Sequence, residues 1–156
     1  TIEKKIKSLR IERLDNLNLL ADEVSTTASI IAKKKIIRKI VHNIQLNFAY
    51  NPPNKYDGSC LDGRDITYNI VPDADLKFYI TANLKTRASR RFKELKKLNK
   101  DVNFKEVLKS MKKRDKNDIN RKIAPLKKAE DAIEIDTTEM KIDDVIDFIV
   151  KYIHKG

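Results

Sequence analysis

The sequence has little of what marks a secreted, metal-binding or membrane protein. Its 156 residues include one cysteine and two histidines, so neither a disulfide framework nor a zinc ligand set can be assembled. No apolar run approaches the roughly 18 residues of a membrane span, and the N-terminus lacks the apolar segment of a signal peptide. We therefore expect a soluble, cytoplasmic protein with no membrane partner and no metal ligands of its own. Cys60, inside an apolar run, is expected to be a buried small hydrophobe.

Positive charge is abundant and is concentrated in one region. The net charge is +11, and residues 85–122 hold 16 Lys and Arg against 5 Asp and Glu, a difference of +11, so the remainder is neutral. Such a block is typical of a solvated helix face, a nucleic-acid surface or a clamp on nucleotide phosphates. Its aromatic residues are only Phe92 and Phe104, both at core-facing spacing. The block therefore lacks the stacking platform of single-strand binders.

Apolar periodicity predicts an α/β protein of one domain, residues 1–156. The predicted helices cover about 2–14, 25–50, 84–98, 103–121 and 142–154, and the predicted strands about 58–62, 75–81 and 132–136. Asn51-Pro-Pro-Asn54 ends the second helix. Strands separated by helices indicate a parallel sheet that is covered on both faces. The three predicted strands are too few to complete such a sheet, because central parallel strands need partner strands on both sides.

Two charged segments stand where apolar segments end. Residues 62–65 follow the predicted strand at 58–62, at the strand end where open α/β sheets bind ligands. The helix at 103–121, with Asn103 as N-cap and Glu106 at N3, carries one stripe at offsets of three and four residues: Phe104, Val107, Leu108 and Met111, then Arg114, Asp118 and Arg121. Inward charges cost desolvation energy, so a charged or polyhydroxylated ligand is expected. From the residues alone, a surface ion pair between Arg114 and Asp118 at i,i+4 stays open.

Seven short blocks follow one another in order along the chain. They are Glu23-Val-Ser-Thr-Thr-Ala-Ser29, Leu61-Asp-Gly-Arg-Asp-Ile66, Pro72-Asp-Ala-Asp-Leu-Lys77, Arg90-Arg-Phe-Lys-Glu-Leu95, the set Arg114, Asp118 and Arg121, Ala124-Pro-Leu126 and Ile135-Asp-Thr-Thr138. From about Leu20 to the C-terminus, the chain resembles the bacterial cytidylate kinases. The resemblance implies a monomeric P-loop nucleoside-monophosphate kinase with a parallel sheet, helices on both faces and a helical lid. It further implies transfer of the ATP γ-phosphoryl group to CMP or dCMP, with Mg²⁺.

The resemblance also indicates how the domain is divided and what it lacks. Residues 1–50 would form a helical substrate-side region, 57–83 the core strands, 84–122 the lid and its flanking helices, and 123–156 the last strand and helix. Family members begin with a strand and a Walker A loop, but with three glycines the motif G-x-x-x-x-G-K-[ST] cannot be written. We therefore expect a longer polypeptide with several dozen further N-terminal residues, and a fold that here misses its first strands. Thr67-Tyr68 also departs from the usual Gly-Thr.

Site roles follow from the same resemblance. CMP would be bound by Ser29, Arg38, Arg64, Asp65, Arg114, Asp118 and Arg121. Ser29, Arg38 and Asp65 would read the cytosine edge. Arg114 and Asp118 would hold the ribose, and Arg64 and Arg121 would face the phosphate.

The lid arginines would bind the other nucleotide. Arg87, Arg90 and Arg91 would contact ATP, and Arg87 and Arg91 would stabilise the transferring phosphoryl group. The spacing does not decide which of these last two points inward. Two other interpretations stay open: a basic nucleic-acid-binding protein that uses residues 85–122, and an inactive fragment that retains CMP affinity. The kinase interpretation predicts CMP or dCMP and ATP as partners, and no nucleic acid.

Overall fold

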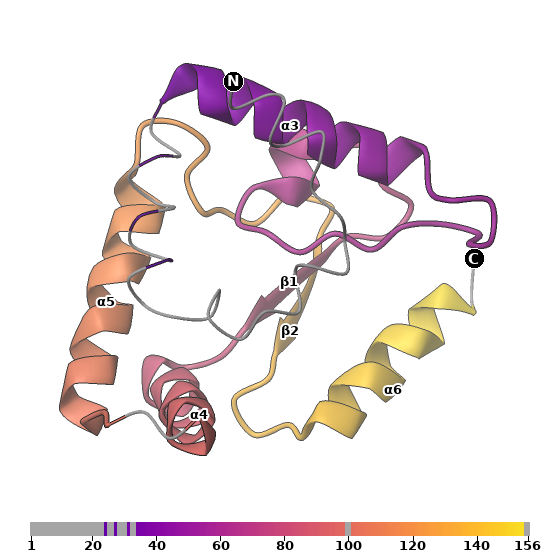
Figure 1. Ribbon diagram of the computed structural model, residues 1–156. Helices are drawn as coiled ribbons and strands as arrows, with labels where there is room; N and C mark the ends of the chain where they lie inside the picture. The colour runs from indigo at the N-terminus through magenta and orange to yellow at the C-terminus, as the bar shows by residue number, and fades with distance from the viewer. Residues whose placement is uncertain (1–23, 25–26, 28–30, 32–33, 99–100, 155–156) are drawn as a thin grey trace. The chain divides into compact units, whose positions relative to one another are not determined.

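The computed structural model describes residues 34–98 and 101–154, together with Val24, Thr27 and Ile31 (Figure 1). Contacts divide the chain into two compact units, Thr1–Leu61 and Asp62–Gly156, and each is described by itself. The single domain expected from the chain length stays a prediction. The helix predicted at about 2–14 lies outside the described residues. Among the described residues, no helix combines the length and hydrophobicity that a membrane span needs.

The first unit contains helix α3, Lys35–Tyr50. The predicted stop is confirmed: Asn51 is the C-cap and donates its backbone N–H to Asn47 O at 3.0 Å. Pro52 and Pro53 have no N–H to continue the helix. Lys34 is the N-cap, so the described helix begins later than the predicted position 25, and most of the residues between lie outside the described part of the chain.

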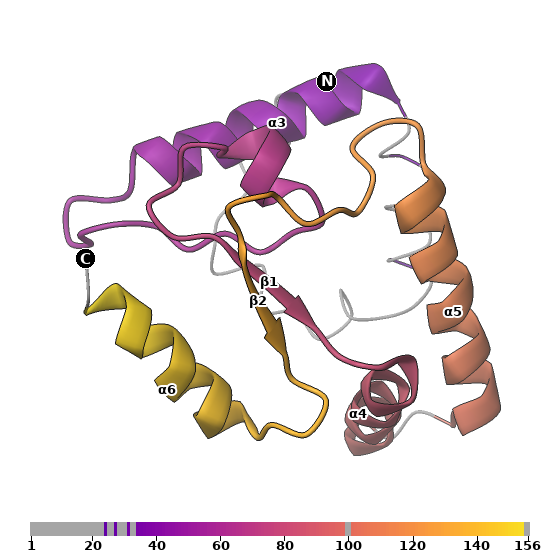
Figure 2. The same ribbon diagram turned by 180° about the vertical axis from the view of Figure 1, so that it is seen from behind.

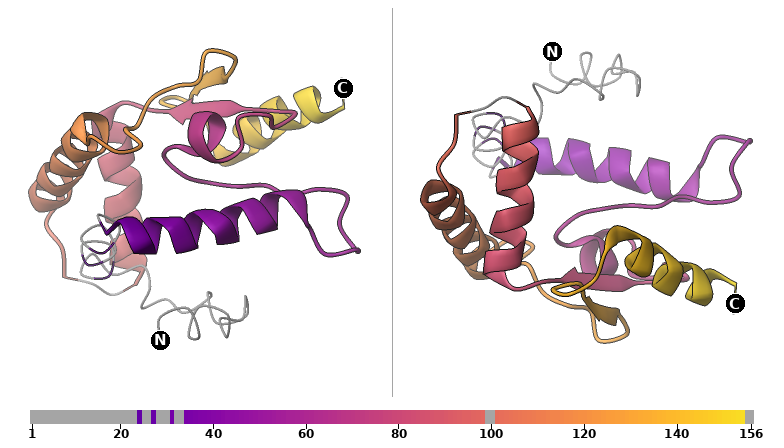
Figure 3. Two further views of the ribbon diagram at one scale, coloured as in Figure 1. Left: turned by 90° about the horizontal axis from the view of Figure 1, so that it is seen from above. Right: turned by 90° about the horizontal axis from the view of Figure 1, so that it is seen from below.

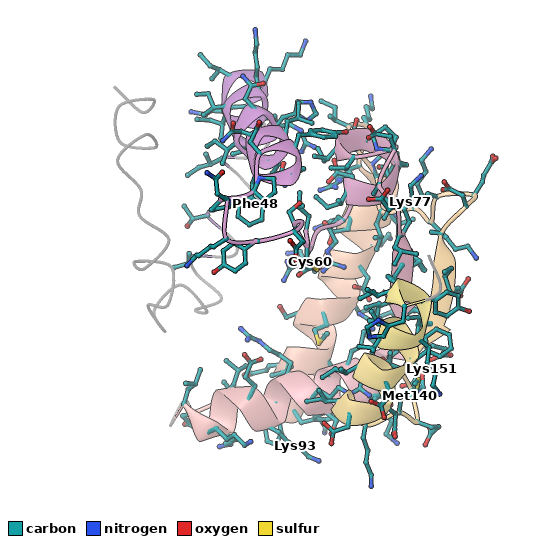
Figure 4. All side chains as sticks on the ribbon, turned by 90° about the vertical axis from the view of Figure 1, so that its right-hand side faces the viewer. Phe48, Cys60, Lys77, Lys93, Met140 and Lys151 are labelled. Atoms are coloured by element: carbon teal, nitrogen blue, oxygen red, sulfur yellow. The ribbon has the colours of Figure 1, made fainter. Side chains whose placement is uncertain are left out.

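The strand predicted at 58–62 is wrong. These residues have no regular secondary structure, and Cys60, labelled in Figure 4, is exposed rather than a buried hydrophobe. A strand requires a neighbouring strand for its ladder of hydrogen bonds. In the described part of the chain, the sheet holds only two other strands, which pair with each other. Ser59 Oγ instead donates to Ala49 O at 2.9 Å, which ties the segment to the end of α3.

The second unit is built on a parallel pair of strands, β1 (Phe78–Thr81) and β2 (Ile133–Asp136) (Figure 2). Phe78 pairs with Ile133 and Thr81 with Asp136. Both strands were predicted, and both are shorter than expected. The connection between them carries α4 (Leu84–Lys97) and α5 (Phe104–Asn120). The predicted α/β arrangement with a parallel sheet is therefore confirmed at this coarse level; the remaining strands and the helical lid stay predictions.

Helices α4 and α5 pack side by side (Figure 3). Their bounds agree with the prediction to within one residue because each begins at a strong cap: Asn83 Oδ1 accepts from Thr86 N at 2.7 Å, and Asn103 Oδ1 from Lys105 N at 2.8 Å. Leu95, with 1% of its surface exposed, lies at the centre of the interface.

Helix α6 (Ile142–Ile153) completes the second unit. Asp144 Oδ2 accepts from Lys141 N at 2.9 Å, and Asp143 and Asp144 lie in the first turn, as predicted, where carboxylates favour the helix dipole. Tyr152 meets Phe78 of β1 edge to face, with ring centroids 5.9 Å apart. This contact holds α6 against the sheet.

Candidate functional site

A tight turn in the second unit presents Arg64 and Asp65. It leads into η3, a π-helical segment at Ile66–Ile70 that closes with a bond from Val71 N to Ile66 O at 2.9 Å. Ile66 and Ile70 are buried and fix the segment to the unit. A Cβ added at Gly63 would lie 2.8 Å from Ile66 Cγ1, so a larger residue would force the buried Ile66 side chain to shift. Single π-helical turns are frequent at functional sites.

Asp65 is held by the segment that it precedes. Asn69 Nδ2 donates to Asp65 Oδ2 at 2.9 Å, and Asn69 N donates to Asp65 O at 3.0 Å. The Asp65 side chain is only 13% exposed. Its second oxygen, Oδ1, lies 3.8 Å from Arg121 Nη2. The carboxylate is therefore oriented by η3 and turned toward the end of α5.

Asp118, on the last turn of α5, is the centre of a charged cluster, which we call the Asp118 cluster: Arg64, Asp65, Arg114, Asp118 and Arg121. Arg64 Nε lies 3.4 Å and Arg114 Nε 3.9 Å from Asp118 Oδ2. Arg121 Nη1 lies 3.9 Å from Asp118 Oδ1. The structure thus brings together five of the seven residues predicted to bind CMP. Three guanidinium groups outnumber the two carboxylates, so the cluster keeps a net positive charge for an anion.

One oxygen of this cluster has an unused acceptor site. Asp118 Oδ2 is inaccessible to solvent and accepts no hydrogen bond from the described residues, because the nearby arginine contacts lack hydrogen-bond geometry. A buried acceptor without a donor is costly and rare in native structures. A ligand hydroxyl would satisfy it once the side chains that cover this oxygen move aside. The cluster therefore offers both an acceptor for a hydroxyl and donors for an anion.

The inward stripe of α5 differs from the prediction at one position. Arg114 was expected to face inward, but its side chain is 60% exposed, whereas the side chains of Asp118 and Arg121 are 17% and 30% exposed. The stripe instead passes through Asp115, which lies four residues after Met111. Arg114 and Asp115, three and four residues after Met111, can both lie on the Met111 face of a helix. The packing of α4 against α5 places Asp115 on the inward side.

Asp115 is a partner that sequence reasoning missed. It receives both Nη atoms of Arg87, at 3.1 and 2.7 Å, in a bidentate pair. Arg87 Nε also donates to Ala82 O at 2.9 Å. The only signal in the sequence was the place of Asp115 on the α5 stripe. Arg87, predicted to bind ATP, thus links the start of α4 to α5; its role toward a phosphate stays a prediction.

The other two arginines predicted to bind ATP, Arg90 and Arg91, also have protein partners. Arg90 Nη1 donates to Thr137 Oγ1 at 3.0 Å and its Nη2 to Met140 O at 3.1 Å, which ties α4 to the segment after β2. Thr137 is buried, with 5% of its surface exposed. Arg91 Nη1 pairs with Glu94 Oε2 at 2.8 Å. Binding of ATP by these arginines stays a prediction.

Two residues of the predicted cytosine-reading set are not located with respect to Asp65. Ser29 lies outside the described residues. Arg38 lies on α3 in the first unit, so its expected approach to Asp65 stays a prediction. Of the three residues, Asp65 is the one whose contacts within the second unit are given above.

The lysines of α4 and α5 lie on solvent-facing surfaces. The exposed ones include Lys93, labelled in Figure 4, and Lys96, Lys97, Lys105, Lys109, Lys112 and Lys116. The lysines of α5 lie in solvent, while Asp118 and Arg121 are partly covered. The basic block therefore divides into a solvated lysine face and a smaller set of arginines that pair with other residues.

Two carboxylates near β2 have lowered pKa values but lie outside the Asp118 cluster. The Thr138 hydroxyl and backbone N–H, which donate to Asp136 Oδ1 at 2.6 and 2.9 Å, hold the pKa of Asp136 below its ordinary value. The hydrogen bond from Lys77 Nζ (Figure 4) similarly lowers the pKa of Asp131. Nowhere in the described part of the chain do three His, Cys, Asp or Glu side chains gather as a metal site would require.

Comparison with known proteins gives one consistent result. A family model described as cytidylate kinase matches residues 3–155. A cytidylate kinase of Bartonella tribocorum (strain CIP 105476 / IBS 506) is 45% identical over 137 residues, which are 88% of this chain and 62% of that protein. A cytidylate kinase of Mesomycoplasma hyopneumoniae (strain 7448) is 42% identical over 147 residues, 94% of this chain and 62% of the relative. The chain thus spans less than two thirds of the length of these relatives.

Proposed function

Because the chain belongs to the cytidylate kinase family, we propose that its protein is a phosphotransferase that moves the γ-phosphoryl group of ATP to CMP or dCMP and gives CDP or dCDP. The observation that carries the proposal is the Asp118 cluster. It combines a buried oxygen that lacks a donor with three guanidinium groups. A nucleoside monophosphate presents the complementary groups, namely sugar hydroxyls and a phosphate.

Asp118 is the proposed ribose ligand. A ribose hydroxyl would donate to Asp118 Oδ2, and the side chains that now cover this oxygen would move to admit it. Arg114 would support the sugar from the exposed side of α5. dCMP retains one of the two ring hydroxyls of CMP, so a single acceptor is compatible with both nucleotides. The acceptor would also fix the orientation of the sugar.

Arg64 and Arg121 are the proposed phosphate ligands. Both Nη atoms of Arg121 lie 3.8 Å or more from the carboxylates of Asp65 and Asp118, which is beyond hydrogen-bond distance. These nitrogens can therefore donate to phosphate oxygens while the carboxylates keep the guanidinium in place. Planar guanidinium groups suit this task because they bind phosphate bidentately.

Asp65 is proposed to read cytosine together with Ser29 and Arg38. A carboxylate accepts hydrogen bonds, and the 4-amino group distinguishes cytosine from uracil by donating them. Uracil presents a carbonyl at that position and would leave Asp65 without its bond. The bond from Asn69 to the other oxygen of Asp65 supports the proposal, because it fixes the orientation of the carboxylate.

Arg87 and Arg91, the two arginines proposed for the transferring phosphoryl group, have different protein partners. Arg87 holds Asp115 through both Nη atoms, and Arg90 is bonded to the segment after β2. Arg91 pairs with Glu94, whose side chain is 47% exposed, and such exposed pairs contribute little free energy. Exchange of that carboxylate for a phosphate would therefore cost little.

Mg²⁺ is proposed as the ion that accompanies ATP. In such kinases, the ion is held largely by substrate phosphates and water. The described residues contain no cluster of carboxylate, histidine or cysteine ligands that fits it. We therefore assign no residue to the ion.

Base choice tests the proposed function. We expect the full-length protein, in a steady-state assay with ATP, to use CMP and dCMP with a much higher kcat/KM than UMP. Asp65→Ala should reduce the preference for CMP over UMP about tenfold, since one buried hydrogen bond is lost, and should leave the KM for ATP within about twofold. The matched control is Asp62→Ala, which removes an exposed carboxylate three residues earlier and should change neither value. Equal use of UMP and CMP by the unmutated protein would refute the assignment.

A further inference from the structure

Tyr68, on η3, connects two parts of the second unit that are distant in sequence. Its hydroxyl donates to Pro125 O, in the loop that follows α5. Lys127 Nζ, from the same loop, lies 4.5 Å from the centroid of the Tyr68 ring. Tyr68 belongs to the Thr67-Tyr68 pair, where the resembling family usually has Gly-Thr. Tyr68 therefore joins η3 to the loop after α5 by a hydrogen bond and a ring contact.

The loop turns back over the end of α5. Leu126 N donates to Asp118 O at 2.8 Å, and Arg121 Nε donates to Ala124 O. Ala124 has a φ of 50°, in the left-handed region that is unfavourable by about 1 kcal/mol for a residue with a side chain. A loop in this conformation persists only where contacts on either side hold it. The Tyr68 hydroxyl supplies one such contact, at the residue directly after Ala124.

This arrangement fixes how Arg121 is presented. With Nε bonded to Ala124 O, the plane of the guanidinium is set by the position of the loop. Its Nη1 and Nη2 then lie 3.9 and 3.8 Å from Asp118 Oδ1 and Asp65 Oδ1. A shift of the Ala124-Pro125 peptide would move the carbonyl that holds Nε and would rotate both Nη atoms.

We propose that Tyr68 is a positioning residue for Arg121. By holding Pro125 O, its hydroxyl fixes the Ala124 carbonyl, and that carbonyl orients the guanidinium toward the phosphate of the bound nucleoside monophosphate. The inference rests on the proposed function, in which Arg121 contacts the phosphate of CMP. Tyr68 is not among the residues proposed to contact CMP, so its effect should be confined to the part of the affinity that the phosphate supplies.

Tyr68→Phe removes only the hydroxyl and keeps the ring beneath Lys127. In the full-length protein, titration calorimetry should give a CMP dissociation constant about fivefold higher, as expected for one lost neutral hydrogen bond. The dissociation constant for cytidine, which has no phosphate, should stay within about twofold. Tyr56→Phe, which removes the hydroxyl of an exposed tyrosine in the first unit, is the matched control and should change neither constant. A parallel loss of cytidine and CMP affinity would mean a general structural role and would overturn the proposal.

A double-mutant cycle with Arg121→Ala tests the role of Tyr68 separately from the proposed phosphate contact of Arg121. If Tyr68 acts through Arg121, adding Tyr68→Phe to Arg121→Ala should lower CMP affinity no further. If Tyr68→Phe lowers CMP affinity by the same factor in the protein with Arg121 and in the Arg121→Ala variant, the proposal is overturned. If Arg121→Ala lowers the ratio of CMP to cytidine affinity and Tyr68→Phe alone does not, the Tyr68 proposal is wrong and the proposed function stands. If Arg121→Ala leaves that ratio unchanged, the phosphate contact is wrong and the Tyr68 proposal falls with it.

Discussion

Asp118→Ala is expected to lower kcat/KM for CMP about a hundredfold in the full-length protein. The substitution removes the buried oxygen proposed to accept a ribose hydroxyl, and hydrogen bonds to charged groups contribute about 1.5–3 kcal/mol. It also leaves Arg64, Arg114 and Arg121 without the carboxylate that lies among them. Each factor of ten in rate corresponds to about 1.4 kcal/mol, so these losses together account for the expected size. Steady-state kinetics at saturating ATP measure it.

A matched control and a milder variant distinguish a loss of CMP binding from a folding defect. Asp101→Ala removes an exposed carboxylate before the start of α5 and should leave kcat/KM unchanged. Asp118→Asn keeps the shape of the side chain and one acceptor oxygen, so its loss should be smaller than that of Asp118→Ala. Melting temperatures of all variants show whether they fold. A folded Asp118→Ala protein with unchanged kcat/KM for CMP would contradict the proposed role of the cluster.

Arg121→Ala is expected to weaken CMP binding about thirtyfold and to leave cytidine binding within about twofold. The reason is that the proposed contact is a charge-assisted hydrogen bond to phosphate, which cytidine lacks. Calorimetric titration of the full-length protein with each ligand measures both constants. The difference between the two ligands isolates the phosphate contribution from any general change in the site.

The comparison variant for Arg121 is Lys116→Ala. Lys116 is an exposed basic residue on the same helix, so this variant removes the same charge from the solvated lysine face. Exposed charges are screened by salt, so CMP affinity should change by less than about twofold. The opposite pattern, in which lysine substitutions dominate and the protein binds RNA or DNA tightly in a salt-dependent way, would make the basic face the functional surface.

The helices of the second unit were predictable because their signals are local. Asn83 and Asn103 are strong N-caps, and α5 carries apolar residues at helical spacing up to Met111. Strands β1 and β2 were also predicted from short runs of β-branched and aromatic residues. In these segments, local preference and tertiary packing favour the same structure.

The failed predictions depend on contacts between distant segments. Ser59-Cys60-Leu61 is apolar enough for a strand, but whether it forms one depends on a neighbouring strand that a local pattern cannot reveal. The π-helical segment Ile66–Ile70 was not predicted either. Five residues are too few for a bond pattern of i to i+5 to leave a periodic signal.

The sequence predicted which residues gather in the Asp118 cluster better than it predicted how their side chains contact one another. Asp65, Asp118 and Arg121 were expected to meet, and they do. The pairing of Arg87 with Asp115 was missed, because offsets of three and four residues from Met111 are equally helical and only the packing of α4 distinguishes them. The support that Tyr68 gives to the loop after α5 lay beyond the sequence for the same reason, since 57 residues separate the two partners.

A crystal structure of the full-length protein with CMP tests the central claim most directly. The account predicts a ribose hydroxyl within hydrogen-bond distance of Asp118 Oδ2, the phosphate on the Nη atoms of Arg121, and the cytosine amino group on Asp65. CMP bound elsewhere, or bound with its phosphate away from Arg121 and its sugar away from Asp118, would contradict the assignment of the Asp118 cluster as the nucleoside-monophosphate site.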